Sequence, residues 1–272
     1  MPRFKLTLEY AGTRYSGWQI QQNARTVQGE LHRAIRAVLK TDRFETYGSG
    51  RTDAGVHALA QVAHLDVATT LEPAALARRV NDELPADIHL LGAEVASHRF
   101  HARKSAVARS YLYQIARERT AFAKPYVWWV KAPLDLAPMR DAAERFTGLR
   151  DFRSFTDDEA DEKSTRVQLD PIEIAESGRL VLIRVRGSHF LWRMARRIVG
   201  VLAETGRGGL TPDEVARFLE RESDAPARLT APASGLFLER VFYEGDRTEL
   251  PLQPAWFTWL YQRPAPGAQP PG

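Results

Sequence analysis

The 272-residue sequence predicts an α+β fold of two ferredoxin-like lobes, each a split βαβ, RRM-like unit, with mostly antiparallel sheets flanking a basic central cleft. Three observations lead to this prediction. Strand-like alternation and helix-like periodicity succeed one another in the order βαββαβ, the order returns in the second half, and the segment between the halves is polar and basic. Sheets with helices on one face leave free faces between which an extended ligand can lie.

The first half of the chain supplies the elements of the first lobe. Apolar residues at positions 4, 6, 8 and 10 alternate with polar ones, which predicts a half-buried strand. Thr26 is then the expected N-cap of a helix with an apolar face. The remaining predicted elements are strands near 44–47, 63–67 and 88–95, and a helix that begins at Thr70 with Pro73 in its first turn.

The second half repeats the pattern with one added helix. A strand is predicted over 107–116, followed by a helix that Asp135 caps and that ends with Gly148 as its C′ residue. Thr211 has the spacing of an N-cap in a second capped helix. The other predicted elements are strands at 167–175, 180–186 and 235–243 and a helix from about 190 to 204.

Shifts in composition predict the domain boundaries. The N-terminal lobe, which carries a glycine-rich loop, is expected to cover residues 1–105, and it ends in the basic stretch HRFHARKS. The C-terminal lobe is expected to cover 106–245. The tail, 246–272, is proline-rich, and its end, RPAPGAQPPG, cannot pack a core and is predicted to be disordered.

Composition excludes several classes of protein. Hydrophobic residues make up 44% and charged residues 26%, as in ordinary globular proteins. The absence of cysteine excludes disulfides, a thiolate nucleophile and a cysteine-ligated metal. We expect a cytoplasmic protein without membrane contact, because the sequence shows neither a signal peptide nor an apolar run of roughly 20 residues.

The charged residues are unevenly distributed. Lys and Arg total 38 against 34 acids, and 32 of the 38 are Arg, a bias that a GC-rich genome also produces. Residues 179–197 contain six Arg and His189 without an acid, whereas acids gather in DDEADE at 157–162. This segregation predicts a positive face and a polyanionic partner.

The densest group of chemically useful residues is GSGRTDAGVHALAQ, residues 48–61. Its spacing matches neither the dinucleotide fingerprint nor the Walker loop. It offers one carboxylate, Asp53, beside Arg51 in a glycine-bounded loop. From spacing alone, Asp53 either forms an Asx-turn or performs chemistry.

Within this loop, GRTDAGVHA resembles the catalytic motif of the tRNA pseudouridine synthase A family. The similarity extends from Phe4 to Tyr243, and five further motifs stand in the same order as in the family: GTRYSGWQIQ at 12–21, ARSYLYQI at 108–115, FRSFT at 152–156, FLWRMARRIVG at 190–200 and APASGLFLERVFY at 231–243. The resemblance implies two ferredoxin-like lobes and a homodimer. It also implies conversion of uridine to pseudouridine in the anticodon stem-loop of tRNA, at positions 38 to 40.

The resemblance also implies roles for eight residues. Asp53 would act as nucleophile or charge stabiliser beside cations that keep it ionised, and Tyr111 would stack on a flipped-out uracil. Trp18 and Leu236 are equally compatible with ordinary core positions. The implied catalytic set is Asp53, Arg51, Tyr111 and Arg196, and the implied substrate-binding set is Arg14, Trp18, Gln19 and Leu236.

No cofactor or metal is expected. The reaction breaks N1–C1′ and joins C5 to C1′, with no net redox change and no imported group. His57 and His64 are seven residues apart and His98 and His101 three apart, but neither pair has carboxylates arranged for a metal site. We expect these histidines to be solvated or to face RNA.

Two other functions compete with this prediction. A non-catalytic RNA-binding protein with paired RRM-like lobes would carry the aromatic RNP1 pattern, which is missing from this sequence. A glycosidase-like hydrolase usually needs two carboxylates in its site, and only Asp53 lies in a suitable loop.

Overall fold

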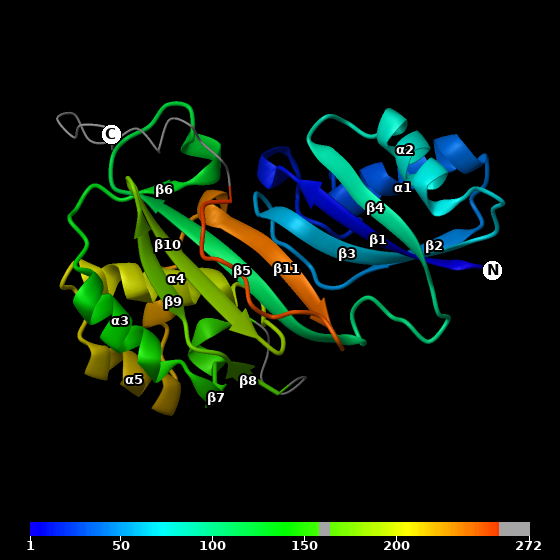
Figure 1. Ribbon diagram of the computed structural model, residues 1–272. Helices are drawn as coiled ribbons and strands as arrows, with labels where there is room; N and C mark the ends of the chain where they lie inside the picture. The colour runs from blue at the N-terminus through cyan, green and yellow to red at the C-terminus, as the bar shows by residue number, and fades with distance from the viewer. Residues whose placement is uncertain (158–163, 256–272) are drawn as a thin grey trace, which may run out of the picture. The chain divides into compact units, whose positions relative to one another are not determined.

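The computed structural model describes residues 1–157 and 164–255 (Figure 1). These residues form six α-helices and eleven strands that pair mostly antiparallel, as an α+β fold requires. The chain divides into two compact units. Unit 1 comprises Met1–Ser110 and Phe237–Thr248, and unit 2 comprises Tyr111–Leu236 and the residues from Glu249 onward. Most of the acidic stretch after Asp157 and the end of the tail lie outside the described residues.

Unit 1 contains the predicted βαββαβ elements. They are β1 (Arg3–Tyr10), α1 (Val27–Leu39), β2 (Phe44–Gly48), β3 (His57–Val67), α2 (Pro73–Glu83) and β4 (Ile88–Ala96). The antiparallel pairs β4–β1, β1–β3 and β3–β2 give the strand order β4-β1-β3-β2. A further strand, β11 (Leu236–Tyr243), runs parallel to β3 where Phe237 pairs with His57.

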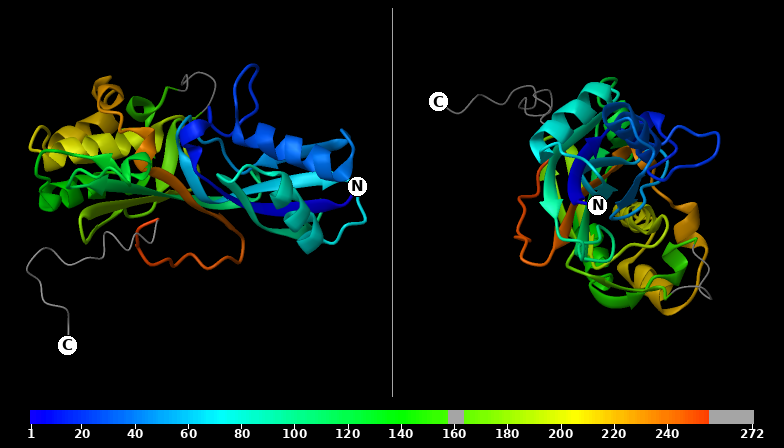
Figure 2. Two further views of the ribbon diagram at one scale, coloured as in Figure 1. Left: turned by 90° about the horizontal axis from the view of Figure 1, so that it is seen from above. Right: turned by 90° about the vertical axis from the view of Figure 1, so that its right-hand side faces the viewer.

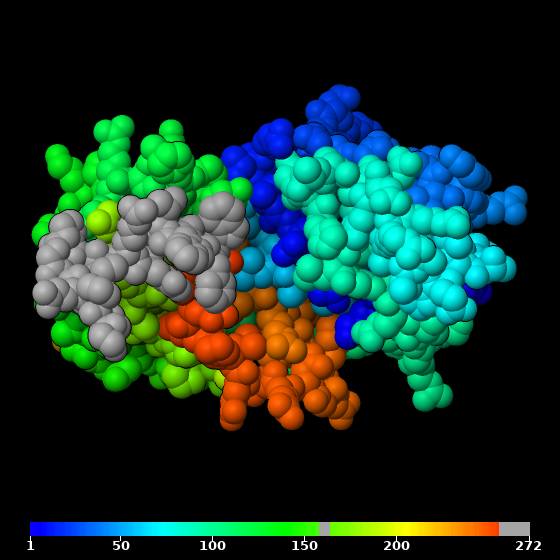
Figure 3. All heavy atoms as spheres, turned by 45° about the horizontal axis from the view of Figure 1, so that its top comes forward, coloured from blue at the N-terminus to red at the C-terminus, as the bar shows by residue number. Residues whose placement is uncertain are grey.

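Alternation in β1 places its apolar side chains in the core of unit 1. Phe4, Leu6, Leu8 and Tyr10 are buried, and the residues between them are partly or fully exposed. Helices α1 and α2 lie side by side against these strands (Figures 1 and 2). The blue and cyan atoms of this part of the chain adjoin on one face of the unit in Figure 3.

The predicted helix starts in unit 1 are right in one case and wrong in the other. Thr26 caps α1 as expected, because its hydroxyl accepts a hydrogen bond from the Gly29 N–H at 3.2 Å. Helix α2 begins at Pro73 rather than Thr70 and has Glu72 at the cap position. Proline needs no N–H partner in the first turn, so it is suited to this first position.

Unit 2 takes up the second half of the pattern. Its elements are β5 (Ala106–Ala116, whose first residues belong to unit 1), β6 (Trp128–Trp129), α3 (Leu136–Arg145), β7 (Gly148–Asp151), β8 (Arg166–Leu169), β9 (Glu173–Ser177), β10 (Leu180–Gly187), α4 (Met194–Gly206), α5 (Pro212–Glu220) and α6 (Ala225–Arg228). The strand order is β5-β10-β8-β7, with β9 on β10 and β6 on β5. Helices α3, α4 and α5 pack together in Figure 1.

Several predictions for unit 2 need correction. The single strand predicted at 167–175 is two strands, β8 and β9, because Pro171 lies between them and cannot donate to a ladder. Helix α4 begins at Met194 rather than 190, since Arg193 has a left-handed backbone with φ 61°. Gly148 has φ 90° but starts β7 instead of ending α3, whose C-cap is Phe146.

The caps of α3 and α5 are confirmed. The Asp135 carboxylate accepts a hydrogen bond from the Ala137 N–H at 2.9 Å. Thr211 and Glu214 form a complete capping box at the start of α5. Among the described residues, no helix has both the length and the apolar character needed to cross a membrane.

Candidate active site

The loop that carries Asp53 connects β2 to β3 in unit 1. Backbone hydrogen bonds tie it to the segment around Tyr15: the Trp18 N–H donates to the Thr52 carbonyl at 3.1 Å, and the Gly55 N–H donates to the Tyr15 carbonyl at 3.3 Å. Within the loop, the Val56 N–H donates to the Asp53 carbonyl at 3.1 Å. Asp53 is therefore a half-buried residue on a loop whose backbone is fixed on both sides.

Two glycines allow this close approach of the segment to the loop. Gly17 has φ 91°, and a Cβ at this position would lie 2.5 Å from the Thr52 oxygen and 3.2 Å from the Asp53 carbonyl carbon. A Cβ at Gly12 would lie 1.9 Å from the Val56 oxygen. Positions 12 and 17, which face the backbone of the Asp53 loop, therefore accommodate only glycine.

Trp18 lies in the core beneath the loop rather than at the surface. Its side chain is 1% exposed, and its ring centroid is 6.1 Å from that of Tyr10. The Tyr10 hydroxyl shares a 2.8 Å hydrogen bond with the Thr52 hydroxyl, and burial raises the pKa of Tyr10 to about 12. Trp18 and Tyr10 therefore support the loop next to Asp53, which corresponds to the core alternative for Trp18.

Further polar contacts hold the beginning of the loop. The Gln61 side-chain amide donates to the Gly50 carbonyl at 3.1 Å, and its oxygen accepts from the Ser49 hydroxyl at 2.7 Å. Arg51 follows these anchors and is exposed. The arrangement presents one cation and one carboxylate, Arg51 and Asp53, on a firmly held backbone.

Arg14 and Gln19 lie at the surface of unit 1. Arg14 forms an exposed ion pair with Asp87 at 3.0 Å, a kind of pair that contributes little to stability. The Gln19 amide donates to the side-chain oxygen of Gln28 at 2.9 Å. Both side chains already have partners within the unit, and both are accessible.

Unit 2 holds the other three predicted site residues, Tyr111 on β5, Arg196 on α4 and Leu236 at the start of β11. Tyr111 is buried and meets Phe190 edge to face, with ring centroids 4.7 Å apart. The Arg196 Nε donates to the Ala231 carbonyl at 2.8 Å, and the Ala231 N–H donates back to the Arg196 carbonyl at 3.0 Å. Leu236, five residues after Ala231, is buried.

Tyr113 completes this part of unit 2 as a core residue. Its hydroxyl donates to the Pro232 carbonyl at 2.8 Å, and a Cβ at Gly235 would lie 2.6 Å from its ring. Burial raises the pKa of Tyr113 well above its usual value, while the charge of Arg196 opposes that shift.

The predicted site residues fall into two sets, one in each unit. Unit 1 holds Arg14, Trp18, Gln19, Arg51 and Asp53, and unit 2 holds Tyr111, Arg196 and Leu236.

The expectation that the histidines are solvated is wrong for His57 and His64, each 1% exposed. The His57 Nδ1 accepts from the Gly12 N–H at 3.0 Å, so this ring supports the same segment that packs on the Asp53 loop. The His64 Nδ1 accepts from the Ala102 N–H at 3.1 Å. Burial, aided by the nearby charge of Arg3, lowers the pKa of His64 to about 4.

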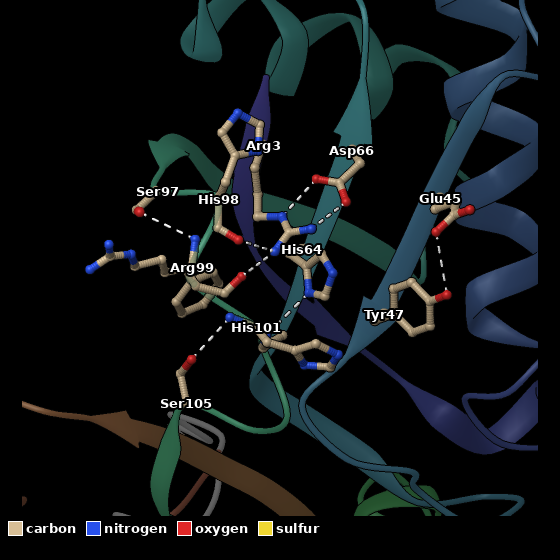
Figure 4. Close-up of polar contacts among 12 residues, drawn as sticks. Arg3, Glu45, Tyr47, His64, Asp66, Ser97, His98, Arg99, His101 and Ser105 are labelled. Atoms are coloured by element: carbon tan, nitrogen blue, oxygen red, sulfur yellow. Dashed lines mark hydrogen bonds and ion pairs between the residues drawn. The ribbon is translucent and has the colours of Figure 1, made fainter. Parts of the chain in front are cut away.

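Figure 4 shows the surroundings of His64. Its ring stacks on Tyr47, with centroids 5.2 Å apart, and meets His101 at 4.7 Å. Beside it, Arg3 donates to Asp66 at 2.7 Å and to the Phe100 carbonyl at 2.6 Å. No group of three histidines, aspartates or glutamates in the described part of the chain is arranged to hold a metal ion.

The positive charge of the Arg-rich segment 179–197 is partly neutralised in the folded structure. Its arginines pair with carboxylates from other parts of unit 2: Arg179 with Glu118, Arg184 with Glu173, Arg186 with Asp170, and Arg193 and Arg197 with Asp157. Glu118 and Asp157 are distant in sequence from the arginines that they pair with, whereas Glu173 faces Arg184 across the paired strands β9 and β10. The prediction counted acids only within the segment and so missed both kinds of partner. Phe190 was also missed as the neighbour of Tyr111, although its place in an aromatic and basic motif was a usable signal.

Comparison with known proteins gives a consistent result. A family model described as tRNA pseudouridine synthase matches residues 7–103 and 142–244. Proteins named tRNA pseudouridine synthase A are 41% identical over 246 residues in Nitrobacter hamburgensis (89% of this chain, 100% of the relative) and 40% identical over 247 residues in Rhodopseudomonas palustris (90% and 100%). The relative from Geobacter sulfurreducens is 40% identical over 243 residues, covering 89% of this chain and 99% of its own length. The resemblance read from the motifs is confirmed, and the chain belongs to the tRNA pseudouridine synthase family and is an isomerase.

Proposed function

We propose that the protein converts uridine to pseudouridine in the anticodon stem-loop of tRNA, at positions 38 to 40, with Asp53 as the catalytic carboxylate. The observation that carries the proposal is the fixed loop around Asp53. Hydrogen bonds from Trp18 and Gly55 hold this loop, and Gly17 packs directly on it. A preorganised backbone positions a reacting group at little entropic cost during the reaction.

One carboxylate is sufficient for this chemistry. The N1–C1′ bond breaks, the base turns, C5 bonds to C1′, the C5 hydrogen leaves as a proton and N1 gains one. Asp53 acts as a nucleophile toward the nucleotide or stabilises positive charge at C1′. No oxidant, reductant or group donor enters this balance, so we expect no cofactor.

The remaining site residues take supporting roles. Arg51 and Arg196 supply positive charge, Tyr111 stacks on the flipped uracil, and Leu236 walls the uracil pocket. Arg14 and Gln19 contact the RNA. Trp18 contributes from beneath the loop as a positioning residue, because its ring is buried against Tyr10.

The architectural part of the proposal is that each half is a ferredoxin-like lobe, with boundaries at 1–105 and 106–245 and a tail from 246. The βαββαβ order and the strand order β4-β1-β3-β2 of unit 1 support it. Family membership supports a cytoplasmic homodimer. It also opposes the non-catalytic RNA-binding alternative, because the family acts by isomerisation.

Incubation with unmodified tRNA transcripts, followed by mapping of pseudouridine, tests the proposal. We expect pseudouridine only at positions 38 to 40 of the anticodon stem-loop. Conversion at other positions would contradict the proposed substrate site. Binding of tRNA with no conversion of any uridine would contradict the proposed activity and support the RNA-binding alternative.

A further inference from the structure

We propose that Trp192 is a stacking surface for an unpaired base of the RNA substrate and that Arg193 holds its indole in place. The inference rests on the proposed function and adds a substrate contact to it. Trp192 lies in the connection between β10 and α4, and its side chain is 49% exposed. Single exposed apolar side chains are common on protein surfaces, so exposure alone does not identify a contact. Three further features of this connection do.

The first feature is the cation beside the ring. The guanidinium carbon of Arg193 lies 4.9 Å from the centroid of the Trp192 ring system. This is the geometry of a cation–π contact, which fixes the plane of the indole. An arginine and a tryptophan in this arrangement resemble the stacking platforms that bind single-stranded nucleic acids.

The second feature is a strained backbone at the same place. Arg193 has φ 61° and ψ 1°, a left-handed conformation that costs free energy for any residue with a side chain. It stands at the N-cap of α4 without a capping side-chain hydrogen bond. The bend turns the chain sharply between the exposed indole and the helix that carries Arg196.

The third feature is a rigid support under Arg193. Its Nη1 lies 3.1 Å from a carboxylate oxygen of Asp157, and the same carboxylate pairs with Arg197. Arg197 is buried and donates to the Thr156 carbonyl at 2.6 Å. Trp192 is thus connected through Arg193 and Asp157 to the interior of unit 2. A ring held this way loses less side-chain entropy when a ligand stacks on it.

The position of Trp192 fits a nucleotide next to the proposed catalytic residues of unit 2. Two residues before it, Phe190 contacts Tyr111, and four residues after it, Arg196 joins α4 to the segment at Ala231. The same connection also carries His189, Phe190 and Arg193, and basic and aromatic side chains are suited to phosphates and bases. An RNA base is therefore the occupant that the chemistry favours.

Trp129 offers a matched control in the same unit. Its side chain is 41% exposed, and Arg119 lies 5.8 Å from its ring centroid. It belongs to β6, which pairs with β5 at Ile115 and Ala116. Tyr111 is four residues before Ile115 on β5, a separation of roughly 13 Å along a strand. Trp129 therefore shares exposure and a cation with Trp192 but not its neighbours.

The experiment measures Kd, KM and kcat on an unmodified tRNA transcript, using the wild type, Trp192→Ala, Trp192→Phe and Trp129→Ala. Losing one stacked base raises Kd by about fivefold or more. We expect this increase in Kd and KM for Trp192→Ala with kcat nearly unchanged. Trp192→Phe keeps an aromatic face and should stay within about twofold of the wild type, as should Trp129→Ala. Circular dichroism and thermal melting establish that each variant is folded.

Equal affinities for Trp192→Ala and the wild type would overturn the inference, and so would a folded Trp192→Phe variant as weak as Trp192→Ala. A change in oligomeric state with unchanged RNA affinity would assign the surface to a protein contact and equally overturn it. These failures differ from failure of the proposed function, in which the wild type itself forms no pseudouridine. In that case a loss of RNA affinity confined to Trp192→Ala would still support the stacking contact.

Discussion

Replacement of Gly17 by alanine tests whether the Asp53 loop must lie where the structure places it. The new Cβ would lie 2.5 Å from the Thr52 oxygen and 3.2 Å from the Asp53 carbonyl carbon. Separations under 3.0 Å are essentially never seen for real Cβ atoms, so the loop has to move away by about half an ångström or more. Gly17 also has φ 91°, which strains any residue that carries a Cβ.

Both effects have known sizes. Left-handed backbone costs roughly 1–2 kcal/mol, and overpacking of a tight contact costs typically about 1–3 kcal/mol. The free energy of unfolding should therefore fall by about 2–5 kcal/mol. Because a displacement of about 1 Å can cost about a hundredfold in rate, we expect kcat to fall by about tenfold to a hundredfold. This fall corresponds to roughly 1.4–2.7 kcal/mol of barrier.

Two glycines separate the causes. Gly148 has φ 90°, and a Cβ at this position would have no described atom within 4 Å, so Gly148→Ala imposes the backbone strain alone. Gly50 lies in the Asp53 loop and is equally open without the positive φ, so Gly50→Ala imposes neither. Urea unfolding gives the stability of each variant, and tritium release from C5-labelled uridine in tRNA gives its turnover. A folded Gly17→Ala variant with kcat within about threefold of Gly148→Ala would refute the reasoning.

Three other predictions concern pH, a helix cap and metals. Burial lowers the pKa of His64 to about 4, so the contribution of His64 to stability is complete above about pH 6.5 and is lost as the pH falls toward 4. The free energy of unfolding in urea should therefore decline over this range, and His64→Phe should reduce the decline; equal declines in both proteins would contradict this assignment. Thr211→Ala removes the capping box of α5 and should cost about 1 kcal/mol of unfolding free energy, with Thr211→Ser as the control that keeps the cap; an unchanged melting temperature would count against it. Turnover should persist in EDTA, since isomerisation needs no metal, and a loss restored only by a transition metal would overturn this expectation.

Local features of the fold were predictable because their causes lie within a few residues. Thr26, Asp135 and Thr211 were identified as caps from short motifs, and each accepts the expected backbone hydrogen bond. Pro171 is also a local signal for the break between β8 and β9, but the apolar alternation around it led to the prediction of one continuous strand. Helix α4 begins later in the chain than predicted because Arg193 has a left-handed backbone, which the periodicity of apolar residues does not reveal.

Long-range features were not predictable in the same way. His64 lies in an alternating strand and looked solvent-facing, but the segment containing His101 and Ala102 covers it. Arg179 and Arg197 looked unpaired because their partners, Glu118 and Asp157, are distant in sequence. The site prediction depended mainly on resemblance, since spacing alone left Asp53 with two interpretations and Trp18 with another two.

The measurement that tests the central claim most directly is tRNA binding and pseudouridine formation by Asp53→Asn, both on the same preparation. Asparagine has nearly the size of aspartate and tolerates the same turn, but it lacks the negative charge and is a poor nucleophile. The proposed role of Asp53 predicts a folded variant that binds tRNA as well as the wild type or slightly better, with turnover at background. A folded variant that binds tRNA and still converts uridine at more than about a hundredth of the wild-type rate, roughly 3 kcal/mol of barrier, would contradict it.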